Sequence, residues 1–182
     1  DDTAAPTTLT SLSYSDTTWS LLFNCSSVFA STELRQALAS AARGAAEVPD
    51  GGLYAAANGL VPDGLTVDGM NYRDTAGDVT PAAVDARALY LTARQTLTTS
   101  DFNKVSLMVP AGSGVTSAAE EINGVWQKEF SLFFSVEEVD GETFAKRLAE
   151  GDYTLALAPI SAESGSVYQT LSQFTATGGG LC

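Results

Sequence analysis

The residues best placed to do chemistry follow an apolar segment late in the chain. Residues 153–158 (YTLALA) are apolar almost throughout, which is typical of a strand that is covered on both faces. The residues after it, Pro159, Ile160, Ser161, Ala162 and Glu163, combine a carboxylate, a hydroxyl and apolar side chains. Small-ligand sites use this mixture, and ligands of open α/β sheets bind at strand carboxyl ends. We therefore expect a binding loop here. A Glu163 that caps a helix beginning near residue 167, or lies in solvent, fits the sequence equally well.

Two other acidic groups suggest a different chemistry. Glu120 and Glu121 are adjacent, and a second group consists of Glu137, Glu138 and Asp140. Glycoside hydrolysis needs two carboxyl groups about 5 to 9 Å apart, so a glycosidase that uses Glu137, Glu138 or Glu163 is one hypothesis. Acids in the first turn of a helix, or on the outward face of a strand, explain the same residues equally well.

A third acidic group lies in a segment rich in glycine and proline. Its oxygen-bearing side chains could bind calcium, but their spacing does not match the alternate-residue pattern of an EF-hand loop. Aspartate and asparagine are ordinary turn formers, so we favour a solvated cluster of turn residues and assign no metal. The group consists of Asp63, Asp68, Asn71, Asp74 and Asp78.

One glycine-rich segment resembles a nucleotide-binding loop. Ala111 to Ser117 (AGSGVTS) lies between a predicted strand and a predicted helix, but Ser117 occupies the third glycine position of G-x-G-x-x-G. A plain turn is the better interpretation. The chain also lacks the Gly-Lys-Ser/Thr of a P-loop, so we expect no cofactor.

Composition excludes several classes of function. The 182 residues carry a formal net charge of −13 with only nine Lys plus Arg, which argues against a nucleic-acid partner. No histidine is present, so Ser-His-Asp and Cys-His nucleophiles and the commonest zinc ligand are ruled out. Most familiar hydrolase mechanisms are therefore excluded. The length suits one domain with one good core.

Cysteine usage and targeting signals are uninformative about compartment. Cys25 and Cys182 could pair only if the end of the chain returned to the first strand, and we favour unpaired thiols. No apolar run approaches the ~20 residues that cross a bilayer, and the first residues resemble no signal peptide. We expect a soluble chain that is a processed or excised piece of a longer one.

Strands and helices must alternate to position the predicted loop. Residues 1–17 are rich in Thr, Ser, Ala and Asp, and we expect a flexible tail or linker. A long segment with six glycines and three prolines, residues 48–81, shows no periodicity, so it is functional or packs on a missing part of the protein. The other periodic segments predict strands at 19–24, 104–109, 134–139 and 153–158, and helices at 33–46, 81–97, from 117, and 141–150.

Particular signals support the helices. Ser117 and Glu120 have the spacing of a capping box. Trp126 falls on the apolar face of the helix that follows and should be a core residue. Asp140 begins the next helix and Gly151 ends it. The pattern predicts an α/β domain with a mixed, mostly parallel sheet.

The ordered set of segments resembles a known family. WSLLFN, ELRQALASAA, NGLVPDGL, VDARALYLTA, VSLMVP, EEINGVWQKEF, VEEVDGETFAKRLAEGDYTLALA and SQFTATGGG follow one another as in the C-terminal lobe of family 5 extracellular solute-binding proteins, over residues 18–180. These proteins are the peptide- and nickel-type receptors of ABC importers. The resemblance covers nearly the whole chain, and its strength lies in the order of the parts.

The resemblance implies both a fold and a function. It implies one lobe of a type II periplasmic-binding-protein fold over residues 18–182, with helices flanking the sheet. The function implied is capture of a small, peptide-like solute by closure of two lobes, without catalysis. The implied partners are the missing N-terminal lobe and an ABC permease. The implied location is a bacterial cell surface, with a lipid anchor on the full-length protein, or the periplasm.

The resemblance also assigns the binding residues and shows where they depart from the family. Leu157, Pro159, Ile160, Ser161 and Glu163 occupy the ligand-facing segment. Ile160 replaces the tryptophan of the peptide receptors, and Glu163 replaces an aspartate that meets the ligand ammonium group. Leu157 stands where some of these receptors have a charged side chain. These differences leave the solute open.

Two other classes of function compete with this reading. A secreted acidic module for interaction or adhesion would show no cleft at the end of the 153–158 strand. The glycosidase would turn over chromogenic glycosides.

Overall fold

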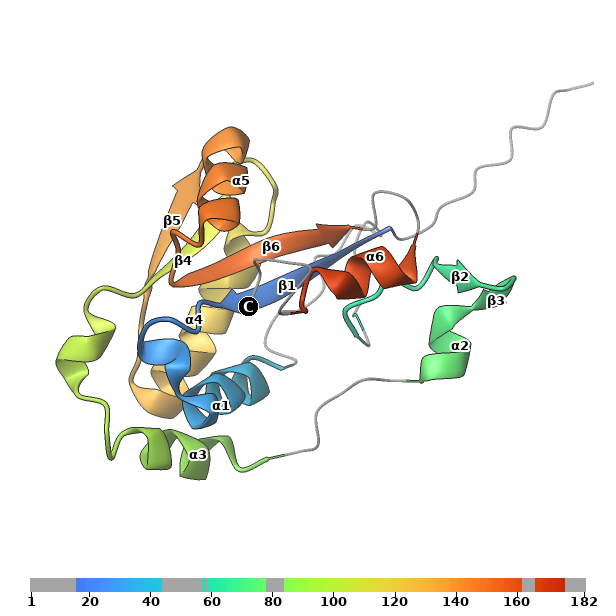
Figure 1. Ribbon diagram of the computed structural model, residues 1–182. Helices are drawn as coiled ribbons and strands as arrows, with labels where there is room; N and C mark the ends of the chain where they lie inside the picture. Colours follow the sequence, from blue (N-terminus) through green and yellow to red (C-terminus); the bar gives the residue numbers. More distant parts are fainter. Residues whose placement is uncertain (1–15, 44–56, 58, 78–83, 162–165, 176–182) are drawn as a thin grey trace, which may run out of the picture.

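The computed structural model of the protein describes residues 16–43, 57, 59–77, 84–161 and 166–175 (Figure 1). A four-stranded sheet lies at its centre. The strands are, in spatial order, β1 (Thr17–Phe23), β6 (Leu155–Ser161), β4 (Ser106–Pro110) and β5 (Ser135–Val139). β4, β5 and β6 run parallel, and β1 runs antiparallel to β6. The predicted α/β class with a mixed, mostly parallel sheet is confirmed.

Strand and helix alternate through the sheet. β4 leads through α4 (Thr116–Phe130) to β5, and α5 (Gly141–Glu150) then leads to β6 on the other side of β4. Both predicted ends of α5 are confirmed. Asp140 Oδ1 accepts a hydrogen bond from the Thr143 amide at 3.0 Å, and Gly151 ends the helix with φ 70°.

The predicted capping box of α4 is wrong. The helix begins at Thr116, its N-cap position is Val115, and no side chain caps it. Ser117 therefore lies inside the first turn, where its hydroxyl cannot serve as an N-cap. The Thr116 hydroxyl instead donates a hydrogen bond to the Glu138 carboxylate on β5.

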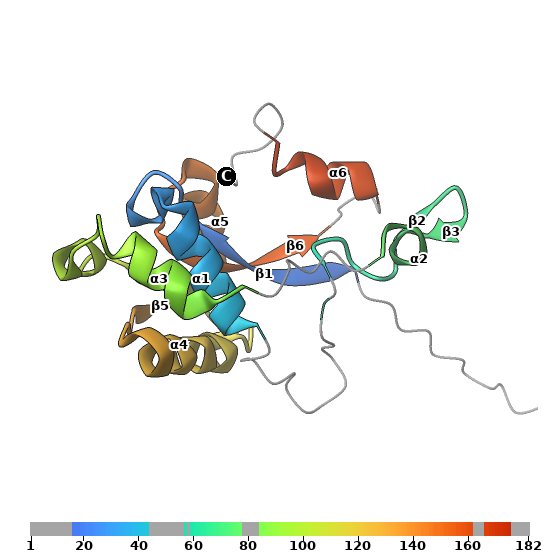
Figure 2. The same cartoon turned by 90° about the horizontal axis from the view of Figure 1, so that it is seen from below.

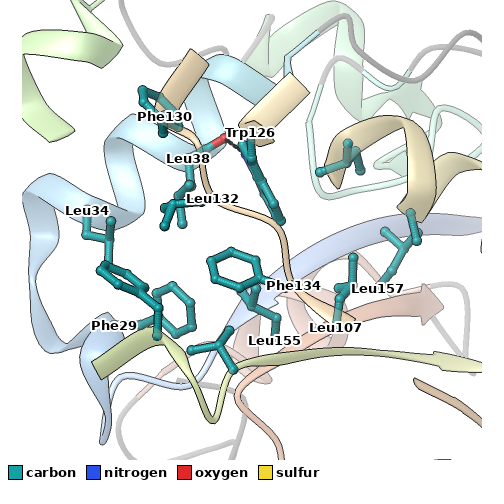
Figure 3. Close-up of a cluster of buried hydrophobic side chains, with 14 of the residues drawn as sticks. Phe29, Leu34, Leu38, Leu107, Trp126, Phe130, Leu132, Phe134, Leu155 and Leu157 are labelled. Atoms are coloured by element: carbon teal, nitrogen blue, oxygen red, sulfur yellow. Dashed lines mark hydrogen bonds between the residues drawn. The ribbon is translucent and has the colours of Figure 1, made fainter. Parts of the chain in front are cut away.

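One face of the sheet is covered by three helices, α1 (Thr32–Ala42), α3 (Ala86–Ala93) and α4 (Figure 2). The larger of the hydrophobic cores lies beneath them (Figure 3). Trp126 is a core residue, as predicted: it is fully buried, and its indole Nε1 donates to the Leu38 carbonyl of α1 at 2.9 Å. Phe134 contacts the Trp126 ring edge-on at 5.6 Å between centroids. These contacts join α1 and α4 to each other and to the segment that leads into β5.

The opposite face is covered by α5 and α6 (Val167–Ser172). A smaller core lies there, in which Phe144 of α5 packs with Met108, Ala156 and Ile160 of the strands. α6 packs on the segment 59–77 through Val167.

The segment predicted to be irregular contains regular structure over residues 66–76. It includes β2 (Thr66–Val67), β3 (Met70–Asn71) and α2 (Tyr72–Ala76). Asp68 (φ 52°) and Gly69 (φ 78°) form the turn of the hairpin. Asp-Gly is a strong signal for a two-residue hairpin turn with both residues at positive φ, and the sequence-based interpretation overlooked it.

Two predicted helices are shorter than expected. α1 ends at Ala42 rather than at residue 46, and residues 44–46 lie outside the described part. α3 begins at Ala86, where the Asp85 carboxylate caps the Ala88 amide at 2.9 Å, and residues 94–96 form a turn. Two short 3-10 helices complete the fold, η1 (Val28–Ala30) and η2 (Thr99–Phe102).

Three sequence-based expectations concern the ends of the chain and its compartment. The predicted tail lies almost wholly outside the described residues, and β1 begins at Thr17. Cys25 is a free thiol, whereas Cys182 lies outside the described residues. Among the helices of the described ranges, none has the length and apolar character needed to cross a bilayer.

Candidate functional site

β4 and β6 pair side by side, and the connections that follow their carboxyl ends leave the sheet on opposite faces. The connection after β4 leads to α4 on one face, and the chain after β6 reaches α6 on the other face (Figure 2). In open α/β sheets ligands bind in the crevice that such a switch in direction creates. The carboxyl end of β6 is therefore the candidate site on topology alone.

Two elements flank this end of β6 (Figure 1). The segment 59–77 packs on α6 through contacts of Val61 and Leu65 with Val167. Leu60 packs on the smaller core that contains Ile160. These contacts fix both elements beside the end of the strand. Large apolar side chains of the two elements remain exposed: Val67, Met70, Tyr168 and Leu171.

A single arginine organises the segment 59–77. Arg73 is only 10% exposed, and its Nε and Nη2 donate to the Val61 carbonyl at 3.1 and 2.7 Å. It also lies 3.7 Å from the Asp63 carboxylate. A Cβ at Gly59 would lie 2.3 Å from the guanidinium, so a larger residue there would require the end of the Arg73 side chain to shift. Sequence reasoning missed Arg73, because nothing local distinguishes it from a surface residue.

The acidic turn residues of this segment serve its folding. The Asn71 side-chain amide donates to the Asp63 carbonyl at 2.7 Å, and its Oδ1 accepts from the Arg73 amide at 2.8 Å as the N-cap of α2. Asp68 forms the hairpin turn. Asp78 lies outside the described residues. Within the described ranges, no three acidic or thiol side chains gather closely enough to hold a metal ion.

The predicted binding loop begins later than expected, because β6 continues through Ser161. Pro159 is tolerated in the strand because its Cα partner is Trp19, and the backbone groups of that pair do not bond to each other. β6 pairs with β4 only at Leu155 and Ala156, so the missing amide of Pro159 faces no strand on that side. Extended backbone thus delivers these residues to the end of the sheet.

The five predicted binding residues occupy three different environments. Leu157 is buried in the larger core, and Ile160, 1% exposed, is buried in the smaller one. Pro159 and Ser161 are exposed and share one face of β6, because side chains alternate along a strand. Glu163 lies outside the described residues. The structure therefore exposes Pro159 and Ser161 on one face of β6, places Leu157 farther back on the same face in the larger core, and buries Ile160 on the opposite face.

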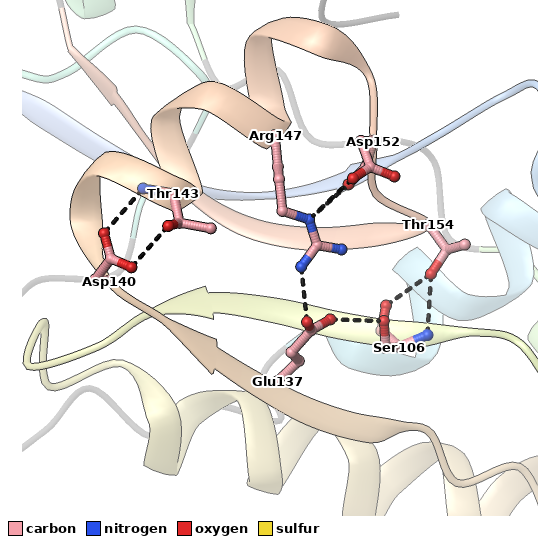
Figure 4. Close-up of polar contacts among 7 residues, drawn as sticks. All are labelled: Ser106, Glu137, Asp140, Thr143, Arg147, Asp152 and Thr154. Carbon is pink, nitrogen blue, oxygen red and sulfur yellow. Dashed lines mark hydrogen bonds and ion pairs between the residues drawn. The ribbon is translucent and has the colours of Figure 1, made fainter.

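The amino end of β6 is held by a polar cluster (Figure 4). Arg147 Nη1 lies 2.7 Å from Glu137 Oε1, and its Nε donates to the Asp152 carbonyl at 3.0 Å. The Thr154 hydroxyl accepts from the Ser106 amide at 2.9 Å and donates to the Ser106 carbonyl at 2.8 Å. The hydrogen bond to Glu137 raises the pKa of Arg147. These groups satisfy one another, which is typical of a structural cluster.

The proposed pair of catalytic carboxylates does not form on β5. Glu137 bonds to Arg147 of α5 on one face of the sheet, whereas Glu138 bonds to Thr116 of α4 on the other. Adjacent strand residues point to opposite faces, so these two carboxyl groups cannot flank one glycosidic bond.

A hollow of about 350 Å³ lies at the other end of the strands. Phe133 lines the hollow and is 63% exposed, whereas its sequence neighbours Leu132 and Phe134 are buried. The hollow has no charged side chain in its wall. Its lining is Thr99, Phe102, Asn103, Val105, Ser131, Leu132, Phe133, Phe134 and Ser135. The sequence signal for this exposed phenylalanine was the run of three apolar residues at 132–134, because a strand with alternating side chains cannot bury all three.

Comparison with known protein families gives no match, and no curated protein sequence matches the chain. Solved structures do match. The pheromone receptor PrgZ, a structure described for its mode of peptide binding, has a TM-score of 0.73 at 20% identity, and the match covers 91% of this chain and 34% of that protein. An oligopeptide ABC transporter substrate-binding domain from Bacillus anthracis has a TM-score of 0.73 at 19% identity, covering 90% and 34%. OppA of Burkholderia pseudomallei has a TM-score of 0.72 at 14% identity, covering 91% and 33%.

The similarity concerns the fold. The chain has a periplasmic-binding-protein-like α/β fold, and it spans about one third of the length of the structures that it matches. The fold expected from the resemblance to family 5 solute-binding proteins is thereby confirmed.

Proposed function

We propose that the chain is one lobe of an extracellular solute-binding protein that captures a peptide-like solute for an ABC importer without catalysis. The solute lies against the carboxyl end of β6, beside the segment 59–77 and α6, which pack on each other. The observation that carries the proposal is the switch in chain direction between β4 and β6, with exposed Pro159 and Ser161 farther along β6 at its carboxyl end. The fold shared with peptide-binding proteins supports it.

The chemistry of this end of the strand fits a ligand that presents both backbone and apolar groups. Ser161 supplies a hydroxyl and Pro159 an apolar surface, and both are exposed. Glu163, which follows two residues later, would supply a carboxylate for a ligand ammonium group. Pockets for small ligands combine apolar walls with a few polar groups of this kind.

Binding requires a second lobe. The chain spans about one third of the matched structures, and closure of two lobes buries a ligand from both sides. The flanking apolar side chains Met70 and Tyr168, 60% and 82% exposed, are available for the opposite lobe to cover. The proposed partners are this lobe and a permease at the cell surface or in the periplasm, where the full-length receptor would be lipid-anchored or free.

Calorimetry on two proteins tests the proposal. A mixture of tri- to hexapeptides from a casein digest is titrated into the 182-residue chain and into the product of the complete reading frame that contains it. We expect saturable binding by the complete receptor and binding at least roughly 100-fold weaker by the single lobe, because half of the contacts are missing. Micromolar or tighter binding by the 182-residue chain would contradict the two-lobe account.

A further inference from the structure

The hollow near the amino ends of the strands has no part in the proposed function. Its volume of about 350 Å³ lies within the range of small-ligand pockets, which is roughly 300–1,000 Å³. One wall consists of residues of η2 and of the turn that leads into β4. The other wall is the segment between α4 and β5, with the first residue of β5. The hollow is therefore large enough to hold a small molecule.

Both walls of the hollow are held in place by contacts behind them. The fully buried Asn123 side chain bonds to the amide and to the carbonyl of Phe134, whose ring lies in the larger core (Figure 3). On the facing wall, Arg94 lies over the Phe102 ring, 5.5 Å from its centroid, and its Nη2 donates to the Thr99 hydroxyl at 3.2 Å. The Phe102 and Phe134 rings, 6.3 Å apart between centroids, join the two walls. The hollow thus has the fixed shape that a preorganised site requires.

Polar groups with open hydrogen-bonding capacity line this shape. The side chains of Asn103, Ser131 and Ser135 are exposed, and none of them makes a hydrogen bond within the described part of the chain. Amide and hydroxyl groups of this kind can both donate and accept. The described residues that line the hollow carry no charge, so the hollow suits a neutral polar molecule rather than an ion.

Ser131 occupies a position at which glycine is the usual residue. It ends α4 in the left-handed conformation, with φ 57°. Helices that end in this way usually do so with glycine, because glycine has no Cβ. The chain follows this rule at the end of α5, where Gly151 has φ 70°. Because the backbone gains nothing from a side chain at position 131, we attribute the serine to its hydroxyl, which faces the hollow.

Phe133 adds an apolar surface beside these polar groups. Its ring lines the hollow and is largely exposed, and an aromatic ring presents a flat apolar face. A sugar ring matches this combination, because it has an apolar C–H face and a row of hydroxyls around its edge. The pairing of one aromatic face with several uncharged donors and acceptors therefore indicates the class of ligand.

We propose that the hollow binds a neutral saccharide unit. The C–H face of the sugar lies on Phe133, and its hydroxyls bond to Asn103, Ser131 and Ser135. This binding is independent of solute capture at the carboxyl end of β6, because the residues that line the hollow all belong to this chain and lie at the other end of the strands. It needs no second lobe. A free peptide is a less suitable ligand, because the lining offers no charged group to pair with its termini.

Saturation-transfer NMR on the 182-residue chain tests the proposal. The probes are glucose, maltose and cellobiose, and N-acetylalanine methylamide serves as an uncharged peptide-like control. We expect saturable binding of at least one sugar with a Kd on the order of 1 mM, because a site with few polar contacts binds a small ligand weakly. The complete receptor should bind the same sugar with the same affinity. Equal affinities for the three sugars would indicate a free sugar as the ligand, and tighter binding of one disaccharide would indicate the end of a glycan chain.

Three variants locate the binding. Phe133→Ala should weaken sugar binding at least about 10-fold, because the apolar face is lost. Ser131→Gly removes the hydroxyl and relieves the positive-φ position, so it should weaken binding about 3-fold or more without lowering the melting temperature. Leu91→Ala is the matched control for Phe133, because Leu91 on α3 is 58% exposed and lies outside the lining of the hollow. It should leave sugar binding unchanged.

Three results would overturn the proposal. The first is no saturable binding of any of the sugars at concentrations up to about 50 mM. The second is binding of the capped amide as tightly as the sugars, which would mean that the hollow recognises amides. The third is sugar binding that survives both Phe133→Ala and Ser131→Gly, which would place the sugar elsewhere on the chain.

Discussion

The two ends of β6 differ in how their polar groups are used. At the amino end, Arg147, Thr154 and the Asn24 side chain tie the strand to β5, β4 and β1. At the carboxyl end, no side-chain hydrogen bond or ion pair within the described part of the chain involves Pro159, Ile160 or Ser161. Contacts within the chain thus hold the amino end of β6, whereas the carboxyl end exposes a hydroxyl and an apolar surface that another molecule can contact.

This contrast separates stability from binding along one strand. Polar groups that satisfy one another stabilise the fold, but they leave no group for a ligand. A binding surface needs groups that are fixed in place by their backbone and by the core below, while their own polar atoms stay open. Ile160 supports the carboxyl end from beneath, and Ser161 stands above it.

The largest expected effect tests this division at the carboxyl end itself. Ile160→Ala removes a side chain that is 1% exposed in the smaller core, and we expect a loss of about 3 kcal/mol in the free energy of unfolding. Urea unfolding of the variant measures it. A loss under about 0.5 kcal/mol, together with weaker solute binding by the complete receptor, would place Ile160 at the ligand rather than in the core.

The second prediction concerns a buried amide near the amino ends of the strands. Asn123 is fully buried, and its side chain donates to the Phe134 carbonyl at 2.9 Å and accepts from the Phe134 amide at 3.1 Å. Asn123→Ala leaves both backbone groups without partners, so we expect a loss of about 2 kcal/mol. The exposed Gln127→Ala on the same helix is a matched control, for which we expect a change near zero.

The third prediction removes the ion pair of the amino end. Arg147→Ala breaks the contact with Glu137, and because the arginine side chain is 22% exposed we expect a loss of only about 1 kcal/mol. Lys146→Ala, an exposed neighbour on the same helix, should be neutral. Equal losses for the two variants would show that the cluster does not hold this end.

The fourth prediction concerns acid. Asp101, just before β4, accepts hydrogen bonds from the Thr98 amide and hydroxyl, and these lower the pKa of its carboxyl group. Because the pKa of this carboxyl group is lower in the folded protein than in the unfolded protein, its ionised form stabilises the fold. This stabilisation is present above the unfolded-state pKa and is lost as the pH falls through the folded-state pKa. The melting temperature of the protein should exceed that of Asp101→Asn at about pH 6, and the difference should disappear near about pH 2. A difference that persists in acid would contradict this assignment.

The smallest expected effect is at the binding surface. Ser161→Ala removes an exposed hydroxyl that makes no hydrogen bond within the described residues, so the free energy of unfolding should change by less than about 0.5 kcal/mol. Chemical unfolding measured beside Ile160→Ala gives the comparison. A loss above about 1 kcal/mol would mean that this hydroxyl has a structural partner.

Local signals predicted part of this fold well. Asp140 and Gly151 set both ends of α5 because capping acts within a few residues, and the apolar face of α4 placed Trp126 in the core. The antiparallel pairing of β1 with β6 joins residues far apart in the sequence, such as Trp19 and Pro159. No local pattern could reveal it.

The apolar residues 153–158 predicted the strand whose carboxyl end is the candidate site, but they did not predict the detail of that site. Ile160 is buried because α5 packs over it, and Arg73 has its role because it bonds to the Val61 carbonyl. Neither property could be predicted from the residue type alone. The role of Glu163 stays a prediction.

Fluorescent labels at two positions test the central claim most directly. In the complete receptor with Cys25→Ser and Cys182→Ser, an environment-sensitive dye is attached through Ser161→Cys at the carboxyl end of β6, or through Phe133→Cys at the hollow near the amino ends. Both positions are exposed. The casein peptides should change the fluorescence of the dye at position 161 saturably and leave that at position 133 unchanged. A response at position 133 alone would contradict the account.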